Sequence, residues 1–200
     1  MEHEEQRLVQ ASQRGDAEAY NQLVRLYERR VFNLCYRMLG EAEAAADVTQ
    51  ETFITAYRKL NQFRGGFFRS WLLRIATNAC YDVLRTQKRR PSISLEAATQ
   101  SEEGGPVLEL ADAGELPEET ALRHELAAAI QQAMAKLPED QRVVLILSDV
   151  QGLAYEEIAV ITSTNLGTVK SRLSRARARM RDLLRAGELL PAQFRHDDDS

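Results

Sequence analysis

The residues whose types and spacing most suggest chemistry are two carboxylates and an amide in the first third of the chain. Asp47, Gln50 and Glu51 stand at positions i, i+3 and i+4, which places them on one face of a helix. Paired carboxylates suit general acid and base chemistry, but that chemistry needs a recessed site with a histidine or metal ligand nearby. The histidines stand in segments expected to be peripheral: His3, His124 and His196. The sequence therefore favours a solvated or partner-binding face and predicts no catalytic residue.

A second group of side chains, in residues 166–185, suits the binding of phosphate. This stretch holds seven cations against the single acid Asp182, although the whole chain carries a net charge of −4. A helix this basic in an acidic protein is typical of a nucleic-acid footprint. Some of its side chains are of types that read base edges in a major groove: Thr168, Lys170, Ser171 and Arg175. A solvated surface helix would explain the cations, but not the helix and turn before them.

The elements that must position these side chains are two short helices joined by a polar turn, over residues 155–185. The first helix has an apolar side, and Val169 with Leu173 gives the second a matching pair, so that the two can pack as a helix-turn-helix. Thr164 or Asn165 is the expected N-cap of the second helix, because a short side-chain oxygen can accept from an unpaired backbone N–H.

A third group combines aromatic rings with positive charge. Residues 58–90 contain nine cations against one acid, and a Gly-Gly turn in this stretch leads into three aromatic residues. Single-stranded nucleic acid is bound by this combination, since bases stack on rings while cations follow the backbone. Phe67 is expected on the surface, whereas Phe68 and Trp71 suit either a core role or a stacking role equally.

The pattern of apolar residues predicts an all-α fold. Strand signals are almost absent, because the β-branched residues fall at helical spacing and no Asn-Gly or Asp-Gly hairpin occurs. Before the helix-turn-helix, the expected helices cover residues 4–14, 17–39, 41–61, 72–85, 118–136 and 138–152.

Caps and apolar stripes define the N-terminal helices. Asp16 should cap the second helix and Gly40 should end it. Its buried stripe is expected to contain Tyr20, Leu23, Val24, Tyr27, Val31, Leu34, Cys35 and Met38. The next helix should bury Val48, Phe53, Tyr57 and Leu60, with the Asp47 face pointing away from Phe53 and Tyr57. The helix over 72–85 should bury Leu72, Ile75, Ala76, Ala79 and Val83, and leave Arg74, Asn78, Tyr81, Asp82 and Arg85 on its other side.

The composition fits one or two globular domains: 200 residues, 44% hydrophobic and 28% charged. No run approaches the roughly 18 apolar residues of a membrane span, and the start lacks the order of a secretory signal. A cytoplasmic protein without membrane insertion is therefore expected. Cys35 and Cys80 lie far apart on separate helix faces without a CxxC pattern, which favours buried free thiols over a metal or redox site.

Composition changes sharply at Pro91. Residues 91–125 contain nine acids against one cation and show no sustained period, which is typical of a linker. The sequence thus predicts a domain over 1–90, a linker over 91–117, a second helical domain over 118–187 and an acidic tail over 188–200 that is expected to fray.

Taken together, these features resemble the extracytoplasmic function (ECF) group of bacterial sigma-70 factors, the RNA polymerase subunits that direct promoter-specific initiation. The segments similar to region 2 of that group are AYNQLVRLYERRVFNLCYRMLG, ADVTQETFITAYRKLNQFRG and FRSWLLRIATNACYDVLR. Those similar to its region 4 are KLPEDQRVVLILSDVQGLAYEEIAVI and TNLGTVKSRLSRARARMRDLL. Their order and spacing cover nearly the whole chain.

The resemblance implies two partners, the core polymerase and promoter DNA, and no cofactor. Asp47, Gln50 and Glu51 would dock on the clamp helices of the largest subunit, and the C-terminal domain would meet the flap of the second-largest subunit. The −10 element would be captured and melted by Arg64, Gly66, Phe67, Arg74, Asn78 and Asp82. The −35 element would be contacted by Lys170, Ser171, Arg172 and Arg175, with Thr168 and Arg179 beside them. An anti-sigma protein is a further candidate partner.

The chain departs from the group's usual pattern in three places. Only Gly66 and Phe67 separate Phe-Arg-Gly from the next Phe, so −10 specificity is expected to be unusual. Ser163 stands where glycine is common, and a positive φ there would strain serine by about 1 kcal/mol. Ala154 replaces a Ser or Thr N-cap, a loss typically of about 1 kcal/mol.

Two other classes of protein compete with this interpretation. A cytosolic helix-turn-helix regulator would bind an operator without polymerase, but it leaves the basic aromatic surface of the first domain unexplained. A hydrolase that uses Asp47 and Glu51 is a remote third, since no substrate can be proposed for it.

Overall fold

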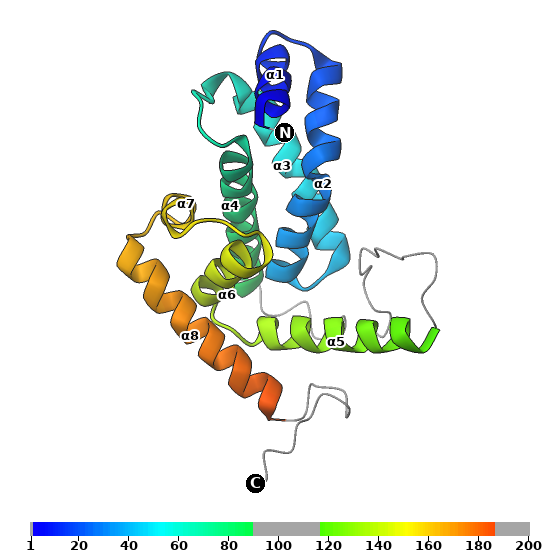
Figure 1. The fold of residues 1–200 in the computed structure, drawn as a ribbon, viewed down its shortest axis with the longest axis vertical. Coiled ribbons are helices and arrows are strands. Elements are labelled where there is room, and N and C mark those ends of the chain that lie inside the picture. The colour runs from blue at the N-terminus through cyan, green and yellow to red at the C-terminus, as the bar shows by residue number, and fades with distance from the viewer. Residues whose placement is uncertain (1, 90–116, 187–200) are drawn as a thin grey trace.

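The structure, a computed structural model, describes residues 2–89 and 117–186, and within these ranges it contains helices and no strand. The N-terminal half forms α1 (Glu2–Gln13), α2 (Ala17–Leu39), α3 (Ala42–Lys59), the 3₁₀ turn η1 (Leu60–Gln62) and α4 (Phe68–Arg89). The C-terminal half forms α5 (Pro117–Ala135), α6 (Glu139–Leu145), the π-helical turn η2 (Ile146–Val150), α7 (Tyr155–Ile161) and α8 (Leu166–Arg185). The predicted all-α class is confirmed (Figure 1). The acidic tail, and the linker apart from Pro117, lie outside the described residues.

Helix α2 begins and ends where the sequence predicts. The side chain of Asp16 accepts from the backbone N–H of Ala19 at 3.0 Å, which satisfies one unpaired N–H of the first turn. Gly40 closes the helix with φ of 82°, a left-handed conformation that glycine adopts at little cost. The predicted stripe is buried except for Val24, which is half-buried.

Helices α2, α3 and α4 form a three-helix bundle, with α1 packed on α2 (Figure 1). Helix α4 starts four residues earlier than predicted, because Phe68 is fully buried and anchors its first turn. Its buried stripe is also rotated from the predicted one: Ile75, Ala79 and Val83 are only half-buried, while Leu73 and Thr77 are buried. Contacts with α2, α3 and α7 together explain the shift, since α4 is covered on more than one side.

The two cysteines meet inside this bundle. Both side chains are fully buried free thiols, and Cys35 of α2 is a hydrogen-bonding partner of Cys80 of α4. The prediction of buried free thiols is confirmed, and two residues that are distant in the sequence are neighbours in space. The hydrogen bond to Cys35 and burial raise the pKa of the Cys80 thiol, which keeps it protonated and unreactive.

In the C-terminal half, α6 continues directly into η2 and provides the core that α7 and α8 cover. Residues 143–147 are buried on this stretch, and Ile158, Val169 and Leu173 close over them. Pro138 is the N-cap residue, with an extended backbone, rather than the first helical residue as predicted. The π-helical geometry at residues 146–150 has no counterpart in the sequence prediction.

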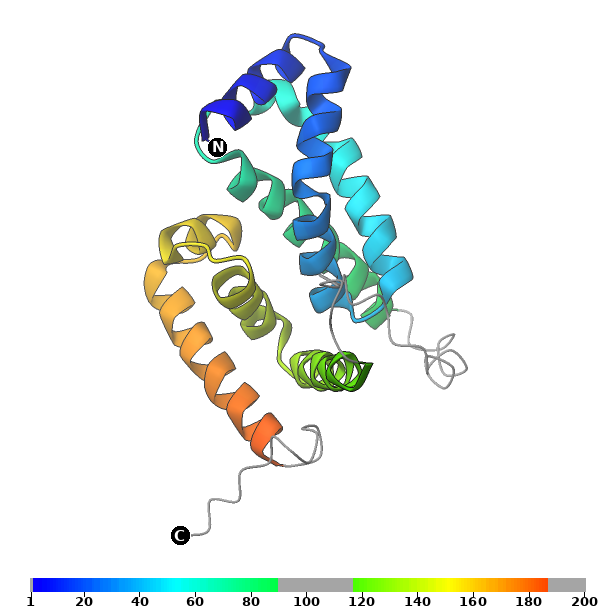
Figure 2. The ribbon, with the colours of Figure 1, turned by 45° about the vertical axis from the view of Figure 1, so that its right-hand side comes forward.

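The two halves pack against each other and share one buried core (Figure 2). Three side chains of the C-terminal half donate to backbone carbonyls of α2: Gln131 to Tyr36 at 3.2 Å, Arg142 to Met38 at 2.6 Å and Gln151 to Arg30 at 3.0 Å. Burial lowers the pKa of Arg142, but its guanidinium also donates to the carbonyls of Ala135 and Leu137. None of the described helices has the length and apolarity that crossing a membrane requires.

Candidate nucleic-acid and partner interfaces

The predicted carboxylate face lies on the surface of α3. Asp47, Gln50 and Glu51 are all exposed, and Glu51 accepts a hydrogen bond from Thr55 at 3.1 Å. Across the described ranges, no group of three or more His, Cys, Asp or Glu side chains is placed to hold a metal ion. The face offers charge and amide hydrogen bonds to a partner rather than a recessed reaction site.

An open groove of about 1070 Å³ runs between α2 and α3, beside Gln50. Its walls are largely apolar and include Val24, Phe32, Phe53, Ile54 and Tyr57. Tyr57, expected in the core, is 50% exposed, and Gln50 does not point away from it. The reason is spacing: positions 50, 53, 54 and 57 follow at steps of three and four and form one stripe. The α3 face therefore combines polar side chains with an apolar groove.

Tyr20 of α2 lines the groove and connects α2 to α3. Its hydroxyl donates to the carbonyl of Phe53 at 2.6 Å, and its ring lies 4.9 Å from that of Tyr57. Burial raises the pKa of Tyr20 to about 12, so the hydroxyl remains a donor at neutral pH.

The loop between η1 and α4 holds one aromatic ring out to solvent. Its two glycines have φ of 112° and 90°, a region that suits glycine alone. Phe67 follows them and is 62% exposed, as predicted. Phe68 is core, and its ring lies 5.7 Å from that of Phe63 and 5.5 Å from that of Trp71. The exposed ring thus stands on a rigid aromatic base.

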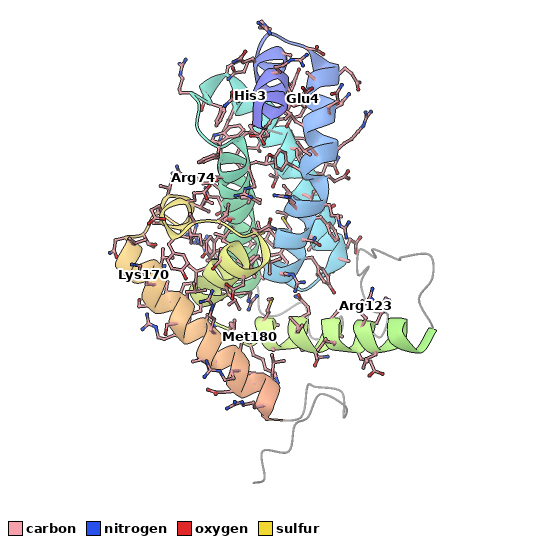
Figure 3. The ribbon with its side chains drawn as sticks, viewed as in Figure 1. His3, Glu4, Arg74, Arg123, Lys170 and Met180 are labelled. Atoms are coloured by element: carbon pink, nitrogen blue, oxygen red, sulfur yellow. The ribbon has the colours of Figure 1, made fainter. Side chains whose placement is uncertain are left out.

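The other expected −10 residues follow this loop along one face of α4. Arg74, Asn78 and Asp82 stand one turn apart and are exposed, as is Arg64 in the loop. Asp82 pairs with Arg85 at 3.3 Å. In Figure 3, Arg74 of α4 lies toward the same side of the molecule as Lys170 of α8.

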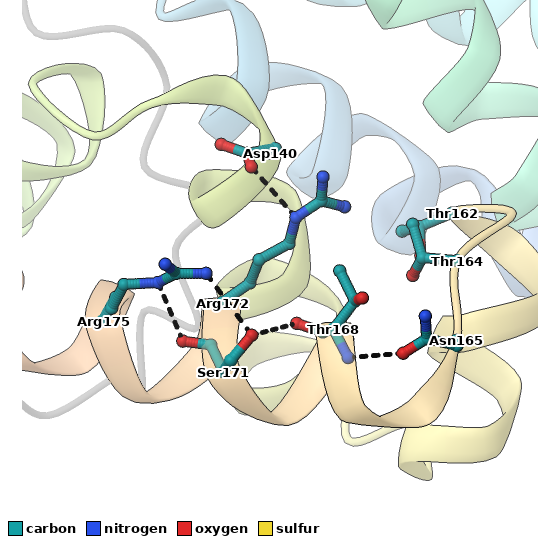
Figure 4. A network of polar contacts seen from close by, with 8 residues as sticks. All are labelled: Asp140, Thr162, Thr164, Asn165, Thr168, Ser171, Arg172 and Arg175. Atoms are coloured by element: carbon teal, nitrogen blue, oxygen red, sulfur yellow. Dashed lines mark hydrogen bonds and ion pairs between the residues drawn. The ribbon is translucent and has the colours of Figure 1, made fainter.

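The turn of the helix-turn-helix contains the strained residue that the sequence predicts. Ser163 has φ of 52°, a left-handed conformation that costs a non-glycine residue about 1 kcal/mol. Asn165, rather than Thr164, caps α8: its side chain accepts from the backbone N–H of Thr168 at 2.8 Å (Figure 4).

Most of the expected −35 residues share the exposed side of α8. Lys170, Ser171, Arg175 and Arg179 are exposed, and Thr168 is half-buried in the first turn. Arg175 folds back along the helix, with hydrogen bonds to the carbonyl and the hydroxyl of Ser171 at 3.2 and 3.3 Å (Figure 4). Its guanidinium must swing outward to meet a base.

Arg172 does not share this side of the helix. Its Nε lies 2.9 Å from a carboxylate oxygen of Asp140 on α6, and its side chain is 24% exposed (Figure 4). Tyr81 of α4 is close by: burial raises its pKa to about 12, against an opposing effect of the Arg172 charge. A contact between Arg172 and DNA would require the ion pair with Asp140 to open.

A second ion pair fixes the middle of α8. Arg177 forms a fork with Asp149 of η2, with its Nε 3.0 Å from one carboxylate oxygen and its Nη2 2.6 Å from the other. The hydrogen bonds from Arg177 lower the pKa of Asp149. Two of the seven cations of α8 thus position the helix instead of standing free for phosphate.

Helix α4, expected to meet the −10 element, contacts α7, the first helix of the helix-turn-helix, in this structure. Glu157 of α7 accepts from Ser70 of α4, and also from the backbone N–H of Ala154 at 3.0 Å. Glu157 thus makes its half of a capping box, while Ala154 has no side-chain oxygen to accept from the backbone N–H of Glu157. The contact between Ser70 and Glu157 could not be predicted from the sequence, because partners distant along the chain leave no spacing pattern.

The comparisons with known proteins follow the same division of the chain. Residues 23–90 match Sigma-70 region 2, and residues 127–180 match Sigma-70, region 4. The RNA polymerase sigma-H factor of Pseudomonas aeruginosa is 41% identical over 88% of this chain and 91% of its own length. The ECF RNA polymerase sigma factor SigW of Bacillus subtilis is 37% identical over 88% of this chain and 95% of its own. The chain belongs to the ECF group of sigma-70 factors.

A solved structure agrees with this assignment. The sigma factor RpoE of Bartonella quintana, in complex with the anti-sigma factor NepR, has a TM-score of 0.63 and 27% identity, over 84% of this chain and 98% of that one. The ECF sigma factor described here is thus an RNA polymerase subunit for promoter-specific initiation. The alternative of a regulator that acts without polymerase is not favoured.

Proposed function

We propose that this sigma factor docks on the clamp helices of the polymerase largest subunit through the α3 face and the groove beside it. The proposal rests on one observation: Asp47, Gln50 and Glu51 are exposed beside an apolar groove of about 1070 Å³. Such a surface suits a partner helix, whose apolar side can fill the groove while its cations meet the carboxylates.

The two basic surfaces have separate roles in this proposal. The loop with Arg64, Gly66 and Phe67 captures and opens the −10 element, and Arg74, Asn78 and Asp82 extend that contact along α4. Helix α8 reads the −35 element through Lys170, Ser171 and Arg175, beside Thr168 and Arg179. Arg172 contacts the −35 element only after its ion pair with Asp140 has opened. Domain boundaries at 1–90, 91–117, 118–187 and 188–200 follow from these roles.

The factor acts in the cytoplasm, has no catalytic residue of its own, and meets the flap of the second-largest subunit through its C-terminal domain. An anti-sigma protein is proposed as a regulator, because the structurally similar Bartonella quintana factor was solved with one.

Docking is tested by Asp47→Ala with Glu51→Ala, measured as affinity for core polymerase. The affinity should fall about tenfold or more, since truncating one partner of a desolvated charge pair costs about 2 kcal/mol or more. Glu4→Ala with Asp182→Ala is the matched control, because it removes two exposed acids from α1 and α8, away from the groove. Unchanged affinity in a variant with wild-type circular dichroism would refute the docking assignment.

A further inference from the structure

Helix α1 precedes the residues that match region 2, yet its last residue reaches the −10 loop. The side-chain amide of Gln13 donates to the backbone carbonyls of Leu60 at 3.0 Å and Phe63 at 2.9 Å. These carbonyls belong to η1 and to the residue that ends it, where the loop begins. One side chain therefore joins α1 to the start of the loop.

The amide of Gln13 holds two backbone carbonyls at once. A primary amide has two N–H donors, and Gln13 directs its amide nitrogen at two carbonyls three residues apart. The fork holds the backbone at Phe63, whose ring packs on Phe68 at 5.7 Å and on Trp71 at 5.3 Å. The amide thereby connects α1 to the aromatic base under the loop.

Other residues of α1 line a hollow between this helix and the loop. The hollow has a volume of about 290 Å³, and its lining includes Glu5, Val9, Gln10, Gln13, Phe63 and Gly66. Apolar contact across an unfilled space contributes little, because dispersion falls off steeply with separation. The hydrogen bonds of Gln13 therefore matter more here than they would in a filled interface.

We propose that Gln13 is a positioning residue for −10 opening, which holds the loop so that Phe67 projects toward the DNA. The proposal rests on the role assigned to the loop above. The two glycines before Phe67 give the backbone freedom, and the fork from Gln13 restricts it at the start of the loop. A loop held in its working geometry loses less conformational entropy when it meets DNA.

The test uses the full-length factor with core polymerase and a duplex promoter that the wild-type holoenzyme selects from a randomised library. Gln13→Leu removes both donors at similar volume, and Gln13→Lys keeps N–H donors at similar reach. Gln10→Leu is the matched control, because Gln10 lines the same hollow from α1 while the amide of Gln13 makes the hydrogen bonds to the loop. The readout is permanganate reactivity of the −10 thymines.

Opening should fall about tenfold in Gln13→Leu, the order expected for the loss of two neutral hydrogen bonds. It should recover in Gln13→Lys and stay at the wild-type level in Gln10→Leu. On a template whose −10 element is already unpaired, Gln13→Leu should initiate like wild type. A folding defect would instead reduce initiation equally on both templates, and that result would overturn the inference.

Phe67→Ala distinguishes the two ways in which the test can fail. If Phe67→Ala opens the duplex as wild type does, the role proposed for the loop is wrong and the inference falls with it. If Phe67→Ala is defective while Gln13→Leu opens normally, the loop keeps its role and only the positioning by Gln13 is wrong.

Discussion

Arg175 and Arg181 belong to the same basic helix, but we expect them to contribute differently to −35 binding. Arg175 lies one turn beyond Ser171, in the N-terminal half of α8 that enters a major groove in helix-turn-helix proteins. Arg175→Ala should cost about 1 to 3 kcal/mol at one base pair and flatten discrimination there. Arg181→Ala should weaken all sequences alike and lower the salt slope by about one.

The measurement is binding of the holoenzyme to a panel of −35 variants at several salt concentrations. Salt must be varied because only phosphate contacts release counterions in proportion to their number. Equal, sequence-independent losses for both variants would mean that α8 follows the DNA backbone and does not read bases.

Ser163 gives a second prediction at the scale of one residue. Its φ of 52° strains a serine but not a glycine, so Ser163→Gly should raise the stability of the helix-turn-helix by up to about 1 kcal/mol. Ser174→Gly is the control: the same exchange on the exposed side of α8 should lower stability by about 0.5 kcal/mol. Thermal unfolding followed by circular dichroism measures both, and a loss of stability in Ser163→Gly would contradict the strain argument.

At the scale of the helix, short-range signals were predictable and long-range partners were not. Asp16, Gly40 and Asn165 act where the sequence places them, because capping depends on neighbours within a turn. The exposure of Tyr57 depends instead on how α2 and α3 diverge to leave a groove. The ion pair of Arg172 with Asp140 and the contact between the two thiols could not be predicted either, because each joins residues that are distant in the sequence.

The surfaces proposed for function show the same division. The exposure of Phe67 could be predicted, since it stands beside two glycines in a turn. The fork of Gln13 could not, because a glutamine in the last turn of a helix has many solvated alternatives. The π-helical turn could not either, since it depends on how α6 meets the rest of the core.

The anchoring of α8 on η2 predicts a pH dependence. Because Arg177 lowers the pKa of Asp149 in the folded protein, the pair stabilises the fold above the ordinary carboxyl pKa of about 4. That stability is lost as the pH falls through the lower, folded-state value. Asp149→Asn should cost roughly 0.5 to 1 kcal/mol at pH 7, a small figure because the pair is partly exposed.

Thermal unfolding between pH 3 and pH 8 tests this anchoring. The curves of wild type and Asp149→Asn should approach each other toward the acid end, as the wild-type carboxylate of Asp149 takes up its proton. Asp182→Asn, an exposed acid near the end of α8, should not reproduce the pattern. A constant difference at all pH values would show that the substitution acts through something other than the charge of Asp149.

For the whole molecule, we expect the packing of its two halves against each other and the simultaneous binding of both promoter elements to be alternative states. Elements at −10 and −35 lie about 25 base pairs apart, or about 85 Å of B-form DNA at about 3.4 Å per pair. In this structure α4, assigned to −10, contacts α7 through Ser70 and Glu157, and α7 packs on α8, the helix assigned to −35. The two halves must therefore separate before one molecule can engage both elements.

A cross-link across this contact tests the requirement for separation. Ser70→Cys with Glu157→Cys, joined by a short bis-maleimide, should abolish initiation from a duplex promoter. Each single cysteine variant treated with the same reagent should retain it, and the buried native thiols should not react. Full activity of the cross-linked factor would show that the protein can initiate transcription with its two halves still packed against each other.

The hydrogen bonds between the halves also bear on how the chain is made. The side chains that donate hydrogen bonds to the carbonyls of α2 stand 95, 104 and 121 residues later in the sequence. At a synthesis rate of about 5 to 20 residues per second, the wait for these side chains is about 5 to 24 s. The N-terminal bundle is complete at Arg89, so for about the last 2 to 12 s of that interval its α2 carbonyls lack these partners. Every newborn copy therefore passes through an uncovered state before its second half exists.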